Sequence, residues 1–284
     1  MEYEIQKLNS KDFPALLKEI PDPPETLYIR GSLPPTTYKL LTVVGSRRMS
    51  RYGEDACRQL IRGLAGYPVA VVSGLALGID GVAHRAALDA GIPTIAIPGS
   101  GLSESVLYPR AHVRLARDIV SKGGALLSEM EPDEAAAPYT FPKRNRLMAG
   151  IAHAILVIEA GVKSGTLITA KLAVDYNREL LVVPHSIFDE GGAGGHVFTK
   201  LGALSVRTAH DILDALGIHN EQKQERMALA PNEEKIMQML VAPMTRDELI
   251  RALRMPIASA NVLLASMELR GLIVETMGEI RKAI

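Results

Sequence analysis

The sequence predicts an α/β protein: an extended Rossmann-like, doubly wound and mostly parallel sheet, followed by a small C-terminal winged-helix-like domain. Short β-branched runs recur through the first two hundred residues, and most lead through a Gly, Ser or Pro turn into a segment of helical period. These runs lack polar alternation, which is typical of strands covered on both faces. The spacing then changes to short helix-like segments followed by two candidate strands.

Residues 1–20 form a lead-in. A proline-rich turn and an extended segment at residues 26–30 follow it. The predicted core strands then cover residues 42–44, 69–72, 94–97, 154–158 and 180–183. The predicted core helices cover residues 52–64, 80–90, 110–122, 165–176 and 208–216. Because ligands of such sheets bind at the carboxyl ends of the strands, we expect the turns that follow them to form the site.

We divide the chain into a core at 1–218, a polar linker at 219–230 and a winged-helix-like domain at 231–284. The predicted elements of that last domain are helices at 232–240, 245–253 and 257–270, and a two-stranded ribbon over 271–276 and 278–282. Thr245 is a plausible N-cap, with Glu248 at the capping-box position.

Composition describes an ordinary soluble globular protein of 284 residues, 47% hydrophobic and 23% charged, with a formal net charge of zero. Zero net charge argues against a wholly basic surface, so any polyanion site must be a local patch. No apolar run is long enough for a membrane span and the N-terminus lacks signal-peptide features, so we expect a cytoplasmic protein. The single cysteine, Cys57, excludes an internal disulfide and a cysteine metal cluster, and is interpreted as a buried thiol.

The first candidate site is the turn after residue 44. Gly45 permits a tight turn, Ser46 can donate to a phosphate oxygen, and Arg47 can hold that phosphate with two parallel N–H bonds. Arg48 adds positive charge. A plain strand-to-helix turn with solvated arginines is the alternative. The dinucleotide fingerprint and the Walker loop are both absent, so no nucleotide cofactor is expected.

A second constellation runs from Ser73 to His84. Asp80 and His84 stand one helical turn apart, but two ligands make a poor metal site. We favour Asp80 as a cap of its helix and His84 as a packed core residue. The glycines of this turn are expected to let it lie close to the turn that carries Arg47.

The third constellation is a basic run that follows Tyr139. Cations interleaved with an amide and flanked by aromatic rings suit single-stranded nucleic acid, which needs charge along its backbone and a ring face for a base. A solvated charged face is the alternative. The residues concerned are Phe141, Lys143, Arg144, Asn145 and Arg146.

The fourth constellation is another strand-to-helix turn, beginning after Glu159. N–H groups and hydroxyls at a helix N-terminus favour an anion, although simple capping by Ser164 or Thr166 stays open. The candidate residues are Lys163, Ser164, Gly165 and Thr166.

The order and the residues of these motifs resemble those of the DNA-processing protein A (DprA, also called Smf) family, from about residue 16 to 216. The strings that carry the resemblance are Val43-Val-Gly-Ser-Arg47, Ser73-Gly-Leu-Ala-Leu-Gly-Ile-Asp80, Tyr108-Pro-Arg110, Leu127-Ser-Glu129, Phe141-Pro-Lys-Arg-Asn-Arg146, Ser164-Gly-Thr-Leu-Ile-Thr-Ala170 and Val183-Pro184. The tail resembles the winged-helix-like module of the same family.

The resemblance implies a protein without known catalysis that binds single-stranded DNA as a homodimer and passes it to the RecA recombinase in natural transformation. By position, Gly45, Ser46 and Arg47 would cradle phosphates and Phe141 would meet a base. Arg144, Asn145, Ser164 and Gly165 would line the same groove.

Four features depart from the family pattern, and one of them is His185, which follows Pro184 where glycine is common. The helical domain that many members carry ahead of the core does not fit within residues 1–12, Gly99-Ser100-Gly101 replaces a common Gly-Cys-Gly, and a glycine-rich loop is expected near 189–196. Because the C-terminal domain is nearly neutral, its binding of duplex DNA and its contact with another protein are two equally open alternatives. The rival function is a phosphoribohydrolase-like enzyme on a related Rossmann core, for which Gly161 to Thr166 would be the phosphate turn and Glu159 the nearby carboxylate.

Overall fold

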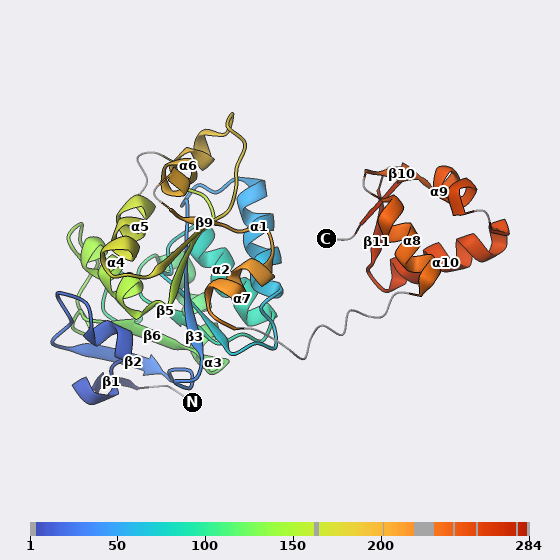
Figure 1. Ribbon diagram of the computed structural model, residues 1–284. Coiled ribbons are helices and arrows are strands. Elements are labelled where there is room, and N and C mark those ends of the chain that lie inside the picture. Colours follow the sequence, from blue (N-terminus) through green and yellow to red (C-terminus); the bar gives the residue numbers. More distant parts are fainter. Residues whose placement is uncertain are drawn as a thin grey trace. The chain divides into compact units, whose positions relative to one another are not determined.

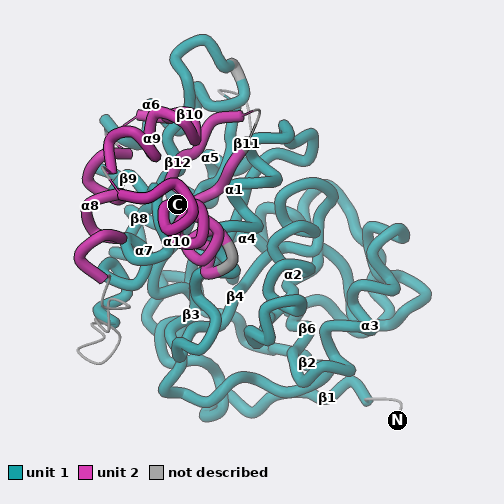
Figure 2. Tube along the Cα trace, turned by 90° about the vertical axis from the view of Figure 1, so that its right-hand side faces the viewer, with its two compact units in different colours: residues 1–219 teal, residues 220–284 magenta. Residues whose placement is uncertain are grey.

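The computed structural model describes residues 4–161, 165–200, 202–218, 230–240, 242–253, 255–276 and 278–282. The chain divides into two compact units, 1–219 and 220–284, coloured separately in Figure 2. Of the predicted linker, only Ala230 lies among the described residues.

Unit 1 contains a nine-stranded sheet in the order β1-β2-β6-β5-β4-β3-β7-β8-β9. All neighbours from β6 to β9 are parallel, and β1 and β2 join that edge antiparallel, so the predicted fold class is confirmed. The strands are β1 Ile5–Leu8, β2 Leu27–Gly31, β3 Lys39–Val44, β4 Val69–Ser73, β5 Thr94–Ala96, β6 Ala125–Ser128, β7 Ala154–Val157, β8 Glu179–Val182 and β9 Leu204–Ser205.

The strand order reverses between β3 and β7. After β3 the chain adds β4, β5 and β6 on one side, whereas β7, β8 and β9 extend the sheet on the other. At such a switch point the two connections leave in opposite directions and open a crevice beyond the carboxyl ends of the strands. The topology therefore directs attention to the turns that follow β3 and β7.

Helices cover both faces of this sheet, as Figure 1 shows. The α-helices of unit 1 are α1 Arg51–Arg62, α2 Ile79–Asp89, α3 Val113–Ser121, α4 Thr140–Ile151, α5 Thr166–Asp175, α6 Ala193–Lys200 and α7 Ala209–Ala215. The 3-10 helices are η1 Ser10–Asp12, η2 Ala15–Lys18, η3 Arg110–His112 and η4 Glu190–Gly192. Apolar residues of α4 and α5 pack on one face, and those of α1, α2 and α7 pack on the other.

Strand β3 shows why the core strands lack an alternation of polar and apolar residues. Leu41 and Val43 point into the core beneath α1 and α2, while Leu40 and Val44 belong to the core beneath α4 and α5. Since successive residues of a strand face opposite sides, a sheet covered on both faces favours apolar residues on both sides of each strand. The buried polar residue of β3 is Thr42, whose hydroxyl donates to the carbonyl of Met148 at 2.8 Å.

Two segments differ from the sequence-based expectation. The glycine-rich stretch predicted as a loop near 189–196 forms η4 and the first half of α6. The basic run that follows Tyr139 lies in α4, with Pro142 in its first turn, where a missing backbone N–H costs no helical hydrogen bond. That helical state determines which basic side chains share a face.

Unit 2 has the helix and strand order of a winged helix. Its elements are α8 Pro231–Met239, β10 Met244–Thr245, α9 Arg246–Leu253, α10 Ile257–Leu269, β11 Ile273–Thr276 and β12 Glu279–Lys282. The strands form a small antiparallel sheet, and the short β10 extends the predicted two-stranded ribbon. The predicted capping box is confirmed, because Thr245 N donates to Glu248 Oε2 at 2.8 Å and Glu248 N donates back to Thr245 Oγ1 at 3.3 Å.

Cys57 is fully buried in α1, as predicted, and burial raises the pKa of its thiol to about 12.

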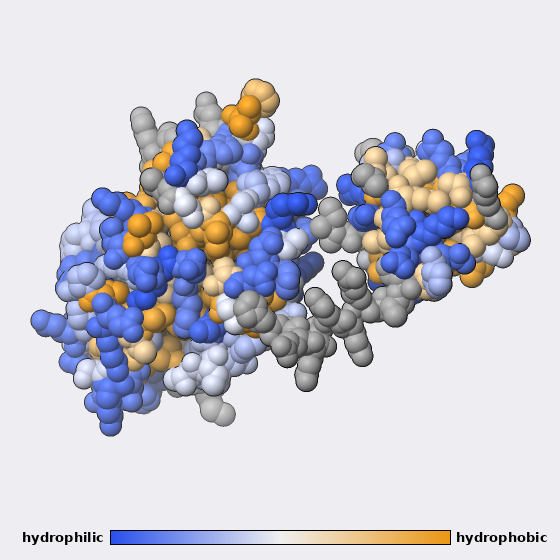
Figure 3. All heavy atoms as spheres, in the orientation of Figure 1, coloured by the Kyte–Doolittle hydropathy of each residue, from blue (hydrophilic) through white to orange (hydrophobic). Residues whose placement is uncertain are grey.

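Figure 3 shows a hydrophobic tip at the top of unit 1, where the loop between β8 and α6 exposes Ile187 and Phe188. In the described part of the chain, no single helix is long and apolar enough to cross a membrane.

Candidate functional site

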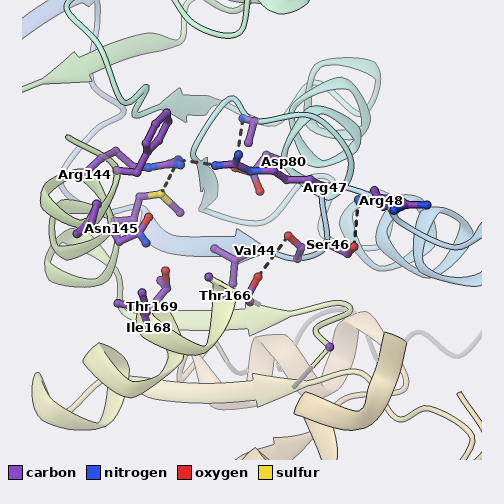
Figure 4. Close-up of a pocket in the computed structure, with 17 residues that line it drawn as sticks. Val44, Ser46, Arg47, Arg48, Asp80, Arg144, Asn145, Thr166, Ile168 and Thr169 are labelled. Atoms are coloured by element: carbon purple, nitrogen blue, oxygen red, sulfur yellow. Dashed lines mark hydrogen bonds and ion pairs between the residues drawn. The ribbon is translucent and has the colours of Figure 1, made fainter. Parts of the chain in front are cut away.

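A cavity of about 860 Å³ opens at the carboxyl ends of β3 and β7, at the switch point of the sheet (Figure 4). Its walls come from the turn after β3, the loop before α2, one face of α4 and the start of α5. The residues that line it are Val44, Gly45, Ser46, Arg47, Arg48, Ala76, Asp80, Phe141, Pro142, Arg144, Asn145, Met148, Gly161, Gly165, Thr166, Ile168 and Thr169.

Glycines hold the turn after β3 against the loop before α2. A Cβ on Gly45 would lie 2.6 Å from Ile79 Cγ1, and a Cβ on Gly78 would lie 2.2 Å from the carbonyl oxygen of Ser46. Gly78 also has a φ of 78°, which side chains rarely adopt. The expectation that these glycines bring the two turns together is confirmed.

The turn presents cations and a hydroxyl to the cavity. Ser46 Oγ accepts from Arg48 N at 3.1 Å, which leaves its own O–H able to donate to a ligand. Arg47 is exposed, and its guanidinium carbon lies 5.4 Å from the centre of the Phe141 ring. Within the described residues Arg47 makes no ion pair, so it can meet an incoming anion without losing an internal partner.

Glu159, at the end of β7, fixes the start of α1 beside this turn. Its Oε2 accepts from Ser50 N at 3.0 Å and from Ser50 Oγ at 2.7 Å, and only 4% of the residue is exposed. Ser50 Oγ in turn accepts from Gly53 N and caps α1. The carboxylate of Glu159 therefore positions a helix, and Glu159 is not among the residues that line the cavity.

Arg144 lines the cavity, as the resemblance implies, and its guanidinium is engaged by internal partners. Its guanidinium lies 3.7 Å from Asp80, both side chains are less than a tenth exposed, and Nη1 donates to the carbonyl of Ile97 at 3.2 Å. Burial lowers the pKa of Arg144, and burial also raises the pKa of Asp80. This internal pair neutralises one of the cations that the sequence assigned to the site.

Asp80 does not cap its own helix as expected. Its Oδ2 accepts from the backbone N–H groups of Gly74 and Ala76 at 3.1 and 3.3 Å, and Gly78 occupies the N-cap position of α2. Asp80 therefore organises the loop that borders the cavity. The interpretation of His84 as a packed core residue is confirmed, because it is fully buried and bonded to Thr94 Oγ1 at 2.8 Å.

Helical periodicity separates the basic residues of α4. Positions 141, 144, 145 and 148 share one face and line the cavity, whereas Lys143 and Arg146 do not line it. Arg146 Nη2 donates to Glu129 Oε2 at 2.6 Å, and Arg146 Nε lies 3.4 Å from Asp22 Oδ2. Internal carboxylates hold the guanidinium of Arg146, and its contact with DNA stays a prediction.

The fourth constellation contributes hydroxyls from α5. Thr166 Oγ1 donates to the carbonyl of Gly45 at 3.3 Å and joins the turns after β3 and β7. Gly165 lines the same wall, while Lys163 and Ser164 lie outside the described residues. Thr169 also lines the cavity and was absent from the predicted site, although it stands three residues after Thr166 on the same helical face.

The arrangement can hold an extended anion. Arg47 and Arg48 supply positive charge, Ser46 and Thr169 supply hydroxyls, and Phe141 supplies a ring face beside them. The described residues contain no group of three or more His, Cys, Asp or Glu that could hold a metal ion. The lining carboxylate, Asp80, is engaged by Arg144 and two N–H groups.

Fold and site together define a class: doubly wound α/β proteins with a cavity at the switch point of the sheet, here joined to a winged-helix unit. Within that class, the chain belongs to the DNA recombination-mediator protein A family, whose model matches residues 4–217. The model of the DprA winged helix domain matches residues 220–279.

Individual relatives agree with this assignment. The chain is 41% identical over 213 residues to Protein Smf of Escherichia coli, covering 74% of this chain and 56% of that protein. It is 40% identical over 201 residues to the DNA processing protein DprA of Streptococcus pneumoniae, covering 71% of this chain and 70% of that one. The chain thus spans little more than half of the length of the Smf relative.

Two solved structures share the fold. The X-ray structure of DprA from S. pneumoniae superposes with a TM-score of 0.70 at 38% identity and covers 74% of each chain. A structure of DNA processing protein A from Helicobacter pylori, described for its single-stranded DNA binding mode, superposes with a TM-score of 0.67 at 27% identity. It covers 76% of this chain and 98% of that one.

Proposed function

We propose that this protein binds single-stranded DNA in the switch-point cavity. The observation that carries the proposal is Arg47, an exposed arginine that lies beside the Phe141 ring in the cavity wall. A flexible polynucleotide needs cations for its phosphates and ring faces for its bases, and Arg47 and Phe141 offer the two side by side. The single-stranded DNA binding described for the H. pylori protein supports the same ligand.

Binding affinity and its salt dependence test the proposal. If the site neutralises about four phosphates, the plot of log K against log salt for an oligothymidine should slope near −3. Arg47→Ala removes one charge-assisted contact, so we expect about 10- to 100-fold weaker binding and a slope smaller by about 0.7. The matched control is Arg114→Ala, which removes an exposed arginine of α3 that does not line the cavity.

Wild-type affinity and an unchanged slope in Arg47→Ala would contradict the proposal. Equal losses in Arg47→Ala and Arg114→Ala would contradict it as well, because they would indicate a diffuse electrostatic attraction rather than a site. Thermal unfolding of both variants checks that the comparison is between folded proteins.

We further propose that the protein acts in the cytoplasm as a mediator of recombination in natural transformation, protects incoming single strands and loads RecA on them as a homodimer. Membership of the recombination-mediator family supports this role. The test is RecA filament assembly on DNA already coated with single-strand-binding protein. Wild type should accelerate assembly and Arg47→Ala should not, whereas equal acceleration by both would contradict a role for the cavity.

The geometry favours a non-catalytic protein over the phosphoribohydrolase-like alternative. Both oxygens of Glu159 face the start of α1, with distances of 3.3 and 3.0 Å to Ser50 N, and the residue is buried. A general acid or base must reach the substrate, and this carboxylate is occupied by the helix cap. Incubation with nucleoside monophosphates should release no free base; release that Glu159→Gln abolishes would favour the enzyme.

A further inference from the structure

Helix α10 has the composition of an enclosed helix, but unit 2 covers only one of its sides. From residue 257 to residue 267 it carries no charge. Its inner side contributes Ala260, Leu264 and Met267 to the apolar core of unit 2. Its outer side exposes Ile257 and Val262, at 67% and 71%. Because a helix that is apolar all round is normally buried, the outer side is a surface that a partner would cover.

A groove of about 570 Å³ lies along this outer side. Ala258, Ser259, Val262 and Ser266 line it from α10, and Asn232 lines it from α8. All of its lining residues are uncharged. The outer side of α10 therefore combines exposed apolar side chains with a hollow, as helix surfaces that pack on other helices do.

The outer side of α10 lacks the cations that duplex DNA requires. In a helix-turn-helix that reads DNA, the second helix lies in the major groove and contacts it through cations and amides. Helices α9 and α10 form the corresponding pair in unit 2, but α10 contains no Lys or Arg. Its one amide, Asn261, accepts from Arg246 Nη1 at 3.5 Å. This side of α10 is therefore suited to protein rather than to DNA.

The residues of this outer side are arranged symmetrically about Val262. Ala258 and Ser259 stand just under one turn and one turn before it or nearly so, and Ala265 and Ser266 stand at the same spacings after it. When a second copy of the helix lies against the first in the opposite direction, Val262 meets Val262 on a two-fold axis. Each alanine then meets a serine, and these small side chains let the two backbones approach closely.

The ends of α10 complement each other in the same antiparallel arrangement. The first turn of α10 has no acidic residue, and its N-cap, Pro256, makes no side-chain hydrogen bond. Glu268, near the other end, lies 3.5 Å from Arg246 and keeps 40% of its side chain exposed. Antiparallel pairing places Glu268 of one copy beside the N-terminus of the other α10, where the helix dipole favours a carboxylate. Parallel pairing would instead bring the two Glu268 side chains together.

We propose that unit 2 pairs with unit 2 of a second copy of this chain, through antiparallel contact of the two α10 helices about Val262. Each copy then covers the apolar side that the other leaves open. With 13 residues α10 is about 20 Å long, so the contact is smaller than the about 800 Å² per partner of a stable interface. The pairing is weak by itself and is strengthened wherever two copies are already held close together.

Disulfide formation between introduced cysteines tests the pairing in the full chain. With oxidised glutathione as the oxidant, Val262→Cys should form an intermolecular disulfide about 10-fold faster than Gln238→Cys, because the axis brings the two thiols together. Gln238 is exposed on α8 and does not line the groove, so it is the matched control. Cys57 is fully buried and is present in both variants.

A mixture of two variants tests the direction of the pairing. Ala258→Cys mixed with Ser266→Cys should form the mixed disulfide faster than either variant alone forms its own, because the antiparallel pair sets these positions opposite each other. If Val262→Cys fails to fold, Ser259→Cys mixed with Ala265→Cys carries the same expectation. Faster disulfides within Ala258→Cys alone would indicate a parallel pair and would overturn the inference.

A charge placed on the outer side of α10 tests whether the apolar contact causes the effect. Ala265→Glu, added to Val262→Cys, should slow the disulfide to the rate of Gln238→Cys, because it puts a carboxylate into the contact. Gln238→Glu adds the same charge elsewhere and should not slow it. Equal rates for Val262→Cys and Gln238→Cys would overturn the inference. Duplex DNA binding that Ala265→Glu removes would overturn it as well, because it would assign this side of α10 to DNA.

Discussion

At the scale of single residues, two arginines of the same cavity have opposite roles because of their surroundings. Arg47 is exposed and lies over a ring, so its charge is available to a ligand. Arg144 is buried against Asp80, and this pair cannot be opened without leaving a charge in an apolar interior. Stability and binding should therefore respond differently to the loss of each.

We expect Arg144→Ala to lower the free energy of unfolding by about 3–5 kcal/mol, because it leaves Asp80 buried without its cation. Arg47→Ala, at an exposed position, should change it by less than about 0.5 kcal/mol. Urea denaturation measures both. The double variant Arg144→Met with Asp80→Asn should lose less than the two single variants together, and strict additivity would show that the pair does not interact.

His84 gives the fold a dependence on pH. Thr94 Oγ1 donates to the carbonyl of Val71 and so accepts from His84 Nδ1–H, while Nε2 is buried without a partner among the described residues. Burial, with a smaller contribution from His112, lowers the pKa of His84 to about 3.

The sign of the effect follows from the unfolded state, where histidine has a pKa of about 6.5. As pH falls below that value the unfolded chain takes up a proton and the folded chain does not, so stability declines from about pH 6.5 toward pH 3, by at most about 1.4 kcal/mol per unit. His84→Gln should flatten the decline measured by urea denaturation between about pH 7.5 and 5. His210→Gln, at an exposed position, should not, and equal slopes would contradict this account.

At the scale of elements, the conformation of α4 decides which of its polar residues can meet a ligand. Read as a string, residues 143–146 present three cations and an amide together. In the helix they point in different directions, and the pairs with Glu129 and Asp22 hold Arg146 away from the cavity. The basic composition was visible in the sequence, but its distribution over helix faces follows from packing that local patterns do not encode.

The two faces of α4 predict different mutational effects. Asn145→Ala should weaken binding of an oligothymidine about 2- to 10-fold, as expected for loss of one neutral hydrogen bond in the cavity. Arg146→Ala should leave that affinity within about 2-fold and instead lower the thermal midpoint, because Glu129 loses its buried partner. Fluorescence anisotropy and thermal unfolding of the two variants distinguish the faces, and the reverse order of effects would contradict the assignment.

The turns after β3 and β7 were predictable because each combines a strand end, glycine and hydroxyl residues within a few positions. The partnership of Asp80 and Arg144 was not, since it joins residues far apart in the sequence, on helices that cover opposite faces of the sheet. Strands β6 and β9 also escaped prediction, and β9 has only two residues, too few for a periodic signal.

At the scale of the whole molecule, the two exposed arginines that line the cavity, Arg47 and Arg48, belong to unit 1. In the described part of unit 2, Arg246 lies 2.6 Å from Glu275 and Arg270 lies 2.5 Å from Glu233, so both side chains are engaged by carboxylates. Unit 2 also has its own apolar core, formed by residues such as Ile236, Leu249 and Leu264. Because the cavity with Arg47 lies in unit 1, we expect the binding of single strands to reside there.

A chain that ends at residue 218 should keep the affinity of the full chain for an oligothymidine within about 3-fold and the same salt slope, because the cavity lies entirely in unit 1. Fluorescence anisotropy over a range of salt concentrations measures both. A larger loss, or a slope reduced by about 0.7 or more, would assign phosphate contacts to residues 219–284.

The burial of Cys57 has a practical consequence. A thiol with a pKa near 12 and no exposed surface should resist maleimide reagents in the folded protein, and it is the chain's only cysteine. Dye pairs can therefore be attached at introduced exposed cysteines, one in each unit, without first removing the native one. Energy transfer between such dyes would follow the separation of the two units as a strand is added.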